Sequence, residues 1–250
     1  MAFPNLTNNY VMSGLQGDQP IILKIGIDQS AIEKEAVCLQ SFAGQGCVKL
    51  LKSDLRRGAL LLECANPGHS LKSFFPKEDH LAIQATVQVM QQLHKAPFST
   101  RQFPSLVQWL HELDKEWELP ANYLEKARHL KYQLLATQGP PVLLHGDLHH
   151  DNILAHNQRY VALDPKGVIG ESAYEVGAYL RNPIPDLMQH GDAKDIIARR
   201  IQGFATELSL NPQRLAQWNY VQAVLSACWK IADGLSPQPF LAYLEIIEED

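Results

Sequence analysis

The chain has 250 residues, of which 46% are hydrophobic and 20% charged, and its formal net charge at pH 7 is −5. These values are ordinary for a globular protein and exclude a disordered chain of low hydrophobicity. The acidic balance gives no basic surface for nucleic acid, and no apolar run approaches the ~20 residues needed to span a bilayer. We therefore expect neither nucleic acid nor a membrane among the partners.

The N-terminus and the cysteines bear on the compartment. Residues 1–9 lack the charged and apolar regions of a secretory signal. The cysteines have no C-x-x-C spacing and stand in apolar surroundings, at Cys38, Cys47, Cys64 and Cys228. Reduced core cysteines in a cytoplasmic protein are the expectation.

Short β-type runs come first along the chain. The patterns predict a hairpin of residues 10–15 and 20–25, followed by a helix over 31–42. Two further strands are predicted, at 48–51 and 59–62. Ser30 is placed to cap the helix. Asn66-Pro67-Gly68 then breaks the chain, which predicts an N-terminal nucleotide-binding lobe over 1–65 and a C-terminal lobe over 66–250.

Helical periodicity dominates the second lobe. Apolar residues at helical spacing, or long runs without breakers, predict helices over 83–93, 103–118, 121–136, 197–208 and 218–228. Two β-prone segments, 142–144 and 160–163, interrupt this helical body and flank a polar loop. A small sheet followed by a helical body predicts an α+β fold with two lobes.

The polar loop carries the chemistry. Residues 145–152 read HGDLHHDN, and residues 162–167 read ALDPKG. Phosphoryl transfer to a hydroxyl requires an aligned nucleophile and neutralised phosphate charge. Asp147 would accept or orient the hydroxyl proton, while Asn152 and Asp164 offer the hard oxygen ligands that Mg²⁺ prefers. Taken singly these residues make turns and caps, but their combined spacing favours a kinase that uses ATP and Mg²⁺.

The histidines of the same loop raise an alternative. His145, His149 and His150 could join neighbouring aspartates in the metal cluster of a zinc hydrolase. Such a cluster needs further ligands from later loops. Only His156 and His190 follow, and neither stands in a convincing ligand setting. The zinc site stays as the weaker alternative.

Lys24 is the next candidate, in an apolar strand-like run. Glu35 falls eleven residues later on the predicted helix. A strand lysine paired with a helix glutamate positions the α- and β-phosphates of ATP in kinases. Glu33 is the competing partner, and Glu35 is preferred because apolar neighbours turn its face inward.

Other nucleotide contacts are expected from backbone groups. Glu63 and Ala65, at the end of the last predicted strand of the first lobe, are candidate hinge residues for the adenine edge. Neither G-x-G-x-x-G nor a Walker A motif occurs. The candidate phosphate-covering loop is therefore Leu6-Thr7-Asn8-Asn9.

These motifs resemble the aminoglycoside phosphotransferase family, in its streptomycin 6-kinase and hydroxyurea phosphotransferase branch. Besides the HGDLHHDN and DPKG motifs, the resemblance covers further short segments, at Gly46–Leu51, Leu61–Glu63, Gly170–Glu171, Tyr174–Gly177, Leu225–Trp229 and Asp233–Gly234. It implies a two-lobed protein-kinase-like fold. It also implies ATP- and Mg²⁺-dependent phosphorylation of a hydroxyl on a small molecule, with streptomycin as the leading acceptor and antibiotic resistance as the result.

Residue roles follow from the resemblance. Asp147 matches the catalytic base, Asn152 and Asp164 match the Mg²⁺ ligands, and Glu175 matches a buried acid that supports the loop. Lys24 and Glu35 match the phosphate-positioning pair. Members usually carry a longer stretch before the hairpin, so a very short or missing first strand is expected. A hydroxylated metabolite or hydroxyurea as acceptor, or a nucleotide-binding module without catalysis, stays open.

A guanidinium-bearing acceptor needs acidic groups in the cleft. The candidates are carboxylates of the second lobe, at Asp151, Glu171, Asp186, Glu245, Glu248, Glu249 and Asp250.

Overall fold

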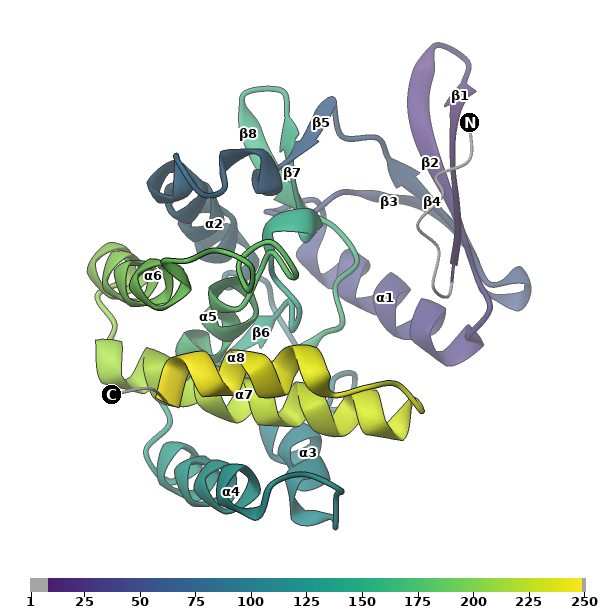
Figure 1. Cartoon of the computed structure of the whole chain (residues 1–250). Helices are drawn as coiled ribbons and strands as arrows, with labels where there is room; N and C mark the ends of the chain where they lie inside the picture. The colour runs from purple at the N-terminus through teal and green to yellow at the C-terminus, as the bar shows by residue number, and fades with distance from the viewer. Residues whose placement is uncertain (1–8, 249–250) are drawn as a thin grey trace.

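The computed structural model describes residues 9–248, and Figure 1 shows a small sheet with one helix standing beside a larger helical body. The sheet is antiparallel with strand order β1-β2-β4-β3. Its strands are β1 (Asn9–Gln16), β2 (Gln19–Gly26), β3 (Leu50–Asp54) and β4 (Ala59–Glu63). The predicted hairpin is present, with its turn at Gly17 and Asp18 between paired Gln16 and Gln19.

Helix α1 (Gln29–Phe42) packs its apolar residues against this sheet and buries Glu35 with them. Its N-cap is Asp28, whose carboxylate accepts from the main-chain N–H groups of Ser30 and Ala31. The predicted cap at Ser30 was wrong, because the preceding carboxylate satisfies two of the unpaired N–H groups at once. Helix α1 thereby starts one turn before Ile32 and presents Glu35 toward strand β2.

Two further small sheets hold the polar loop. The strand β5 (Pro67–Ser70) pairs with β7 (Ile153–His156), and β7 pairs with β8 (Arg159–Ala162). In the other sheet β6 (Pro141–Leu144) pairs with β9 (Val168–Glu171). The two predicted flanking strands, β6 and β8, therefore belong to different sheets, and residues 145–152 cross from one sheet to the other.

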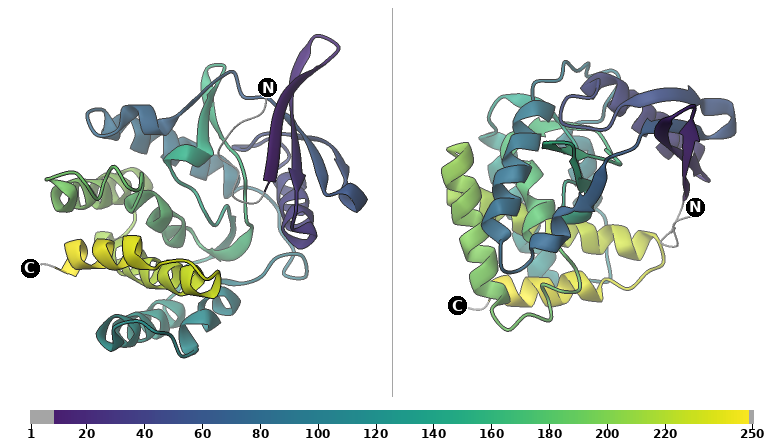
Figure 2. Two further views of the ribbon diagram at one scale, coloured as in Figure 1. Left: turned by 45° about the vertical axis from the view of Figure 1, so that its right-hand side comes forward. Right: turned by 90° about the horizontal axis from the view of Figure 1, so that it is seen from above.

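Helices make up the rest of the second lobe. They are α2 (Asp79–Leu93), α3 (Leu106–Leu110), α4 (Ala121–Ala136), α5 (Ser172–Leu180), α6 (Ala193–Leu208), α7 (Pro212–Ala232) and α8 (Gln238–Glu248). In the views of Figure 2, α7 and α8 lie side by side, consistent with their tertiary contacts. None of the helices described here is long and apolar enough to cross a membrane.

The predicted helix over 103–118 was wrong in its length. Helix α3 ends at Leu110 and continues as a short 3-10 turn, His111–Asp114. The indole N–H of Trp117 donates to the carbonyl of Glu112 at 2.8 Å, and Arg128 Nε donates to Leu113 O at 2.7 Å. These side chains take the acceptors that a longer helix would have used.

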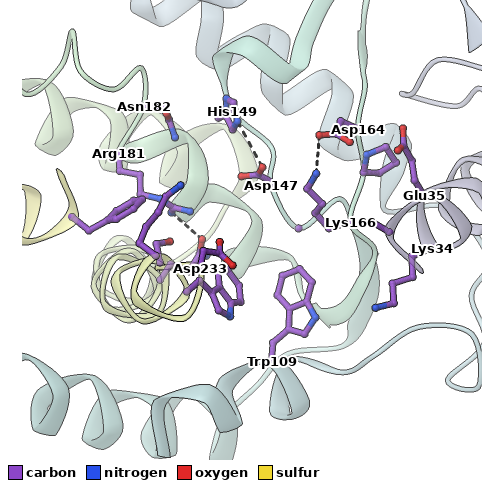
Figure 3. A pocket seen from close by; sticks show the side chains of 18 of the residues that line it. Lys34, Glu35, Trp109, Asp147, His149, Asp164, Lys166, Arg181, Asn182 and Asp233 are labelled. Atoms are coloured by element: carbon purple, nitrogen blue, oxygen red, sulfur yellow. Dashed lines mark hydrogen bonds and ion pairs between the residues drawn. The ribbon is translucent and has the colours of Figure 1, made fainter. Parts of the chain in front are cut away.

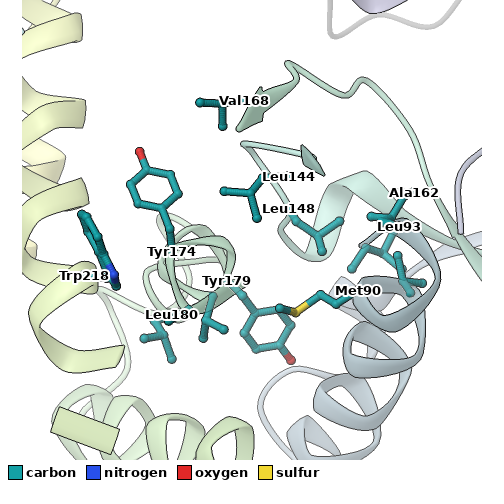
Figure 4. Packing of buried hydrophobic residues seen from close by; sticks show 14 of the residues in the cluster. Met90, Leu93, Leu144, Leu148, Ala162, Val168, Tyr174, Tyr179, Leu180 and Trp218 are labelled. Carbon is teal, nitrogen blue, oxygen red and sulfur yellow. The ribbon is translucent and has the colours of Figure 1, made fainter. Parts of the chain in front are cut away.

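The core of the second lobe surrounds α5, which is buried from Ala173 to Leu180. In Figure 4 its Tyr174 lies toward Trp218, while Tyr179 lies toward Met90 of α2. Tyr174 packs edge-to-face on Trp218 of α7, with ring centroids 5.2 Å apart. Leu148, inside the polar loop, is fully buried in this core. The loop is therefore anchored by apolar packing as well as by hydrogen bonds.

Candidate active site

A cavity of about 780 Å³ lies between α1, the polar loop and the ends of α7 and α8. This volume suits a small-molecule site. In Figure 3 Asp147 stands in the middle, with Asp164 and Glu35 on one side and Asp233 and Arg181 on the other. The cavity thus brings predicted catalytic, metal and phosphate residues to one place.

The buried carboxylate of Glu175 fixes the start of the polar loop. Its two oxygens accept from the main-chain N–H groups of His145 at 2.6 Å and Gly146 at 2.9 Å. His145 is fully buried, and its Nε2 lies 2.9 Å from the carbonyl oxygen of Leu163. Burial lowers the pKa of His145. The residue is a neutral structural link between the two motif segments.

Gly146 occupies a position that only glycine fits. Its φ is +86°, and a Cβ there would lie 2.8 Å from Cη2 of Trp109. The chain therefore turns sharply just before Asp147, with the indole of Trp109 against the turn. This geometry directs Asp147 into the cavity, where its side chain is about one-third exposed.

Asn152 is held by the same loop. Its Nδ2 donates to the carbonyl oxygen of Asp147 at 2.9 Å and lies 3.2 Å from Nε2 of His149. These contacts leave Oδ1 as the acceptor atom of the amide. The side chain is thereby tied to the residue it is expected to assist.

Lys24 joins the sheet to the loop that follows β8. Its Nζ lies 2.6 Å from Glu35 Oε2 and 2.7 Å from Asp164 Oδ1. Glu33 is exposed and bonds Gln29 instead, so the structure pairs Lys24 with Glu35. Burial opposes the charge on Lys24, but the two carboxylates outweigh it and raise its pKa. The ammonium stays charged inside the fold.

Asp164 is held between two lysines. Its φ is +60°, and its Oδ2 accepts from Lys166 Nζ at 2.7 Å. Burial opposes ionisation of Asp164, but Lys166 and Lys24 outweigh it and hold the pKa of its carboxyl at about 2. Asp164 offers an ionised carboxylate and Asn152 an amide oxygen, which are hard donors of the kind that Mg²⁺ prefers.

The histidines of the loop do not converge on a metal. His145 reaches Leu163, His149 stands beside Asp147 and Asn152, and His150 Nε2 lies 3.3 Å from Arg200 Nη2. Across residues 9–248 no group of three or more His, Cys, Asp or Glu side chains is arranged to hold a metal ion. The geometry gives the zinc interpretation no support.

The hinge candidates lie outside this cavity. The main-chain N–H of Glu63 donates to Lys49 O at 2.9 Å, and its carboxylate accepts from the N–H of Lys49. Ala65 is half-buried against the core. The adenine contacts of Glu63 and Ala65 stay a prediction. Of the predicted phosphate-covering loop, Leu6–Asn8 lie outside the described residues, and Asn9 lines the cavity.

Within residues 9–248, the acidic residues predicted for the acceptor do not line the cavity. Glu171 is buried against Arg214, and Asp186 pairs with Lys72. The others within the described range stand elsewhere on the second lobe, and Glu249 and Asp250 lie beyond it.

Other residues line that part of the cavity. Their side chains come from α3, the end of α5, α7 and the segments that follow α7, and include Trp109, Arg181, Trp229, Lys230, Asp233 and Phe240. Helical periodicity cannot reveal which turn of a helix reaches a cavity. The resemblance did point to Trp229 and Asp233, without a role.

Comparison with known proteins gives consistent matches. The family model described as aminoglycoside/hydroxyurea antibiotic resistance kinase matches residues 9–234. Streptomycin 3''-kinase of Klebsiella pneumoniae is 30% identical over 91% of this chain and 86% of its own length. Streptomycin 6-kinase of Streptomyces griseus is 25% identical, over 86% of this chain and 72% of its own length. Hydroxyurea phosphotransferase of Kitasatospora aureofaciens is 24% identical, over 90% of this chain and 67% of its own length.

Solved structures agree on the fold. A thermostable mutant of aminoglycoside phosphotransferase APH(4)-Ia, in a ternary complex with ADP and hygromycin B, superposes with a TM-score of 0.72 at 14% identity, covering 99% of this chain and 92% of that one. Choline kinase LicA from Streptococcus pneumoniae superposes with a TM-score of 0.70 at 12% identity, covering 98% of this chain and 90% of that one. The predicted two-lobed kinase-like fold is confirmed.

Proposed function

Since the chain belongs to the family of aminoglycoside and hydroxyurea antibiotic resistance kinases, we propose that it transfers the γ-phosphoryl group of ATP to a hydroxyl of streptomycin. The observation that supports this most is the meeting of Asp147, Asp164 and Glu35 around one cavity. A base for a hydroxyl and a carboxylate for a metal–phosphate complex are the parts that phosphoryl transfer needs.

Asp147 acts as the base in this proposal. The acceptor oxygen attacks the γ-phosphorus, and the bond from phosphorus to the β–γ bridging oxygen breaks, so ADP leaves with that oxygen. The hydroxyl proton passes to the carboxylate of Asp147. Glu175 supports this step indirectly, because its bonds to His145 and Gly146 fix the turn that points Asp147 into the cavity.

Lys24 and Glu35 position the nucleotide. The 2.6 Å pair supports this role, because a kinase lysine paired with a helix glutamate contacts the α- and β-phosphates. Asn152 and Asp164 would hold Mg²⁺, which when bound neutralises phosphate charge. We assign Glu63 and Ala65 to the adenine edge and keep the division into lobes at residues 65 and 66.

The acceptor and its hydroxyl are the finer part of the proposal. The Klebsiella pneumoniae streptomycin kinase, at 30% identity, is a 3''-kinase, and those of Streptomyces griseus and Streptomyces glaucescens, at 25% and 24%, are 6-kinases. Streptomycin is common to all of them, so we propose it as the acceptor, at its 6-hydroxyl as the motif branch implies. Cytoplasm is the proposed compartment, because ATP is the co-substrate and the described cysteines are free thiols.

The test is turnover by the purified chain with Mg-ATP. We expect ADP release and a singly phosphorylated product with streptomycin, and ³¹P–¹H NMR of the product identifies the 6- or the 3''-hydroxyl. Hydroxyurea and simple sugar alcohols complete the panel. If Mg-ATP binds but no streptomycin-like compound is phosphorylated, the antibiotic assignment fails, and a product from hydroxyurea would replace it.

A further inference from the structure

One wall of the cavity contains two indoles and a carboxylate. Trp109 of α3 and Trp229 of α7 meet edge-to-face, with ring centroids 5.5 Å apart and an interplanar angle of 86°. Asp233 follows α7 and lines the same cavity. Figure 3 places Trp109 and Asp233 below Asp147, away from Asp164 and Glu35. In this view the two labelled residues of the wall lie apart from the carboxylates of the predicted nucleotide site.

This wall is next to the reacting position. A Cβ on Gly146 would lie 2.8 Å from the ring of Trp109, so the indole touches the loop one residue before Asp147. A molecule whose hydroxyl reaches Asp147 would pass over Trp109 or Trp229. The pair is thus placed to contact the acceptor.

Asp233 has an available carboxylate. Its main-chain N–H closes α7 by donating to Trp229 O at 3.0 Å. Its side chain makes neither a hydrogen bond nor an ion pair with any residue in the described range 9–248, including Lys230 on the same wall. An unpaired carboxylate beside aromatic rings is the chemistry that binds an organic cation, by charge and by the ring faces.

We infer that Trp109, Trp229 and Asp233 form a subsite for a guanidinium group of the acceptor. The inference rests on the proposed acceptor phosphorylation and names residues for it. A planar guanidinium stacks on an indole and donates in pairs to a carboxylate, which a neutral sugar does not. Lys230 and Arg181 are like charges lining the same part of the cavity, so both oppose the cation that Asp233 attracts.

The opposite signs of these charges give a sharp test. The variants are Asp233→Asn, Lys230→Gln, Trp229→Leu and Trp229→Phe, with Asp18→Asn in the exposed β1–β2 turn as the control. KM and kcat for streptomycin are measured at saturating Mg-ATP. We expect Asp233→Asn to raise KM about fivefold and Lys230→Gln to lower it by about twofold, with kcat within about twofold of the unchanged chain.

The tryptophan variants distinguish a contact between the cation and an aromatic ring from a mere loss of side-chain volume in the cavity. Trp229→Leu should raise KM about tenfold, and Trp229→Phe should recover most of the loss because it restores a ring face. Asp233→Asn and Lys230→Gln moving KM in the same direction, or leaving it unchanged, would overturn the subsite.

Failure of the proposed function is recognised separately. Calorimetric titration of streptomycin into the Mg-ADP complex measures binding without turnover. If the unchanged chain phosphorylates only another acceptor but still binds streptomycin, and Asp233→Asn weakens that binding about fivefold, the subsite stands while the proposed function falls. If streptomycin does not bind, the subsite is overturned too.

Discussion

The ammonium of Lys24 lies 2.7 Å from the carboxylate of Asp164, although 140 residues separate them in the chain. Lys24 comes from a central strand of the first sheet, and Asp164 follows a strand of the second lobe. One ion pair therefore joins the two halves of the candidate active site. Since Glu35 shares the same ammonium, removal of Lys24 leaves two carboxylates facing each other.

Lys24→Met should lower both stability and activity. The buried Glu35 loses its partner, which costs about 3–5 kcal/mol in the free energy of unfolding. The double variant Lys24→Met/Glu35→Leu should recover most of that stability, because no buried charge is left uncompensated. Urea unfolding measures the first effect and ADP release the second. If activity returned with stability in the double variant, Lys24 would have no part in phosphate positioning.

Asp147→Asn should abolish most turnover while Mg-ATP still binds. The amide cannot take the hydroxyl proton, and loss of a positioned base typically costs ~10²–10⁴ in kcat. Asp151→Asn is the matched control, because Asp151 is exposed in the same loop and does not line the cavity. Single-turnover rates measure the loss of turnover, and calorimetry measures whether Mg-ATP still binds. Wild-type-like turnover in Asp147→Asn would remove the base assignment.

Glu175→Gln tests how the loop is held. The carboxylate accepts two main-chain N–H groups, and the amide of glutamine turns a donor toward one of them. We expect a loss of about 1–3 kcal/mol in stability and a fall in kcat larger than the change in KM for ATP. Glu245→Gln on the exposed side of α8 is the control. Equal stability of the two variants would contradict the anchoring role.

The sequence could reveal the parts of the site that are close along the chain. Asp147, Asn152 and Asp164 stand within one loop and the hairpin after it, so their spacing limits how far apart they can lie. The pairing of Lys24 with Glu35 could be predicted for a related reason, since a strand and the helix that follows it pack together.

The residues of the proposed acceptor subsite could not be predicted in this way. Trp109 and Asp233 come from α3 and the end of α7, more than 120 residues apart. Nothing local shows that both face one cavity. Glu171 and Asp186 seemed suitable by charge, but each pairs with a basic residue within the second lobe. Burial of an acidic residue depends on partners that the sequence does not bring together.

The last prediction concerns acid stability and the buried cluster of His150, Arg200 and Asp79. Arg200 is fully buried and its Nη2 and Nε reach the two oxygens of Asp79 at 2.8 and 2.6 Å. His150 stacks on Tyr179 with centroids 4.0 Å apart. Burial lowers the pKa of His150 from 6.5 to about 4; Arg200 adds to this and Asp79 opposes it.

Because the folded pKa lies below the unfolded one, neutral His150 contributes stability that is complete above pH 6.5. It is lost as the pH falls toward 4, where the unfolded chain has taken up a proton that the folded chain refuses. The loss amounts to about 3 kcal/mol over that window. Asp79, whose pKa is lowered to about 2 by His150 and Arg200 against the effect of burial, adds a second loss below pH 4.

Urea unfolding between pH 7 and 4 measures the first loss. His150→Gln should flatten the dependence in that range, whereas His80→Asn on the exposed surface of α2 should leave it unchanged. If His150→Gln does not fold, NMR titration of the His150 ring in the unchanged chain gives the same answer, since the ring should stay neutral down to about pH 5. A ring that titrates near 6.5 would mean that the cluster is open to solvent.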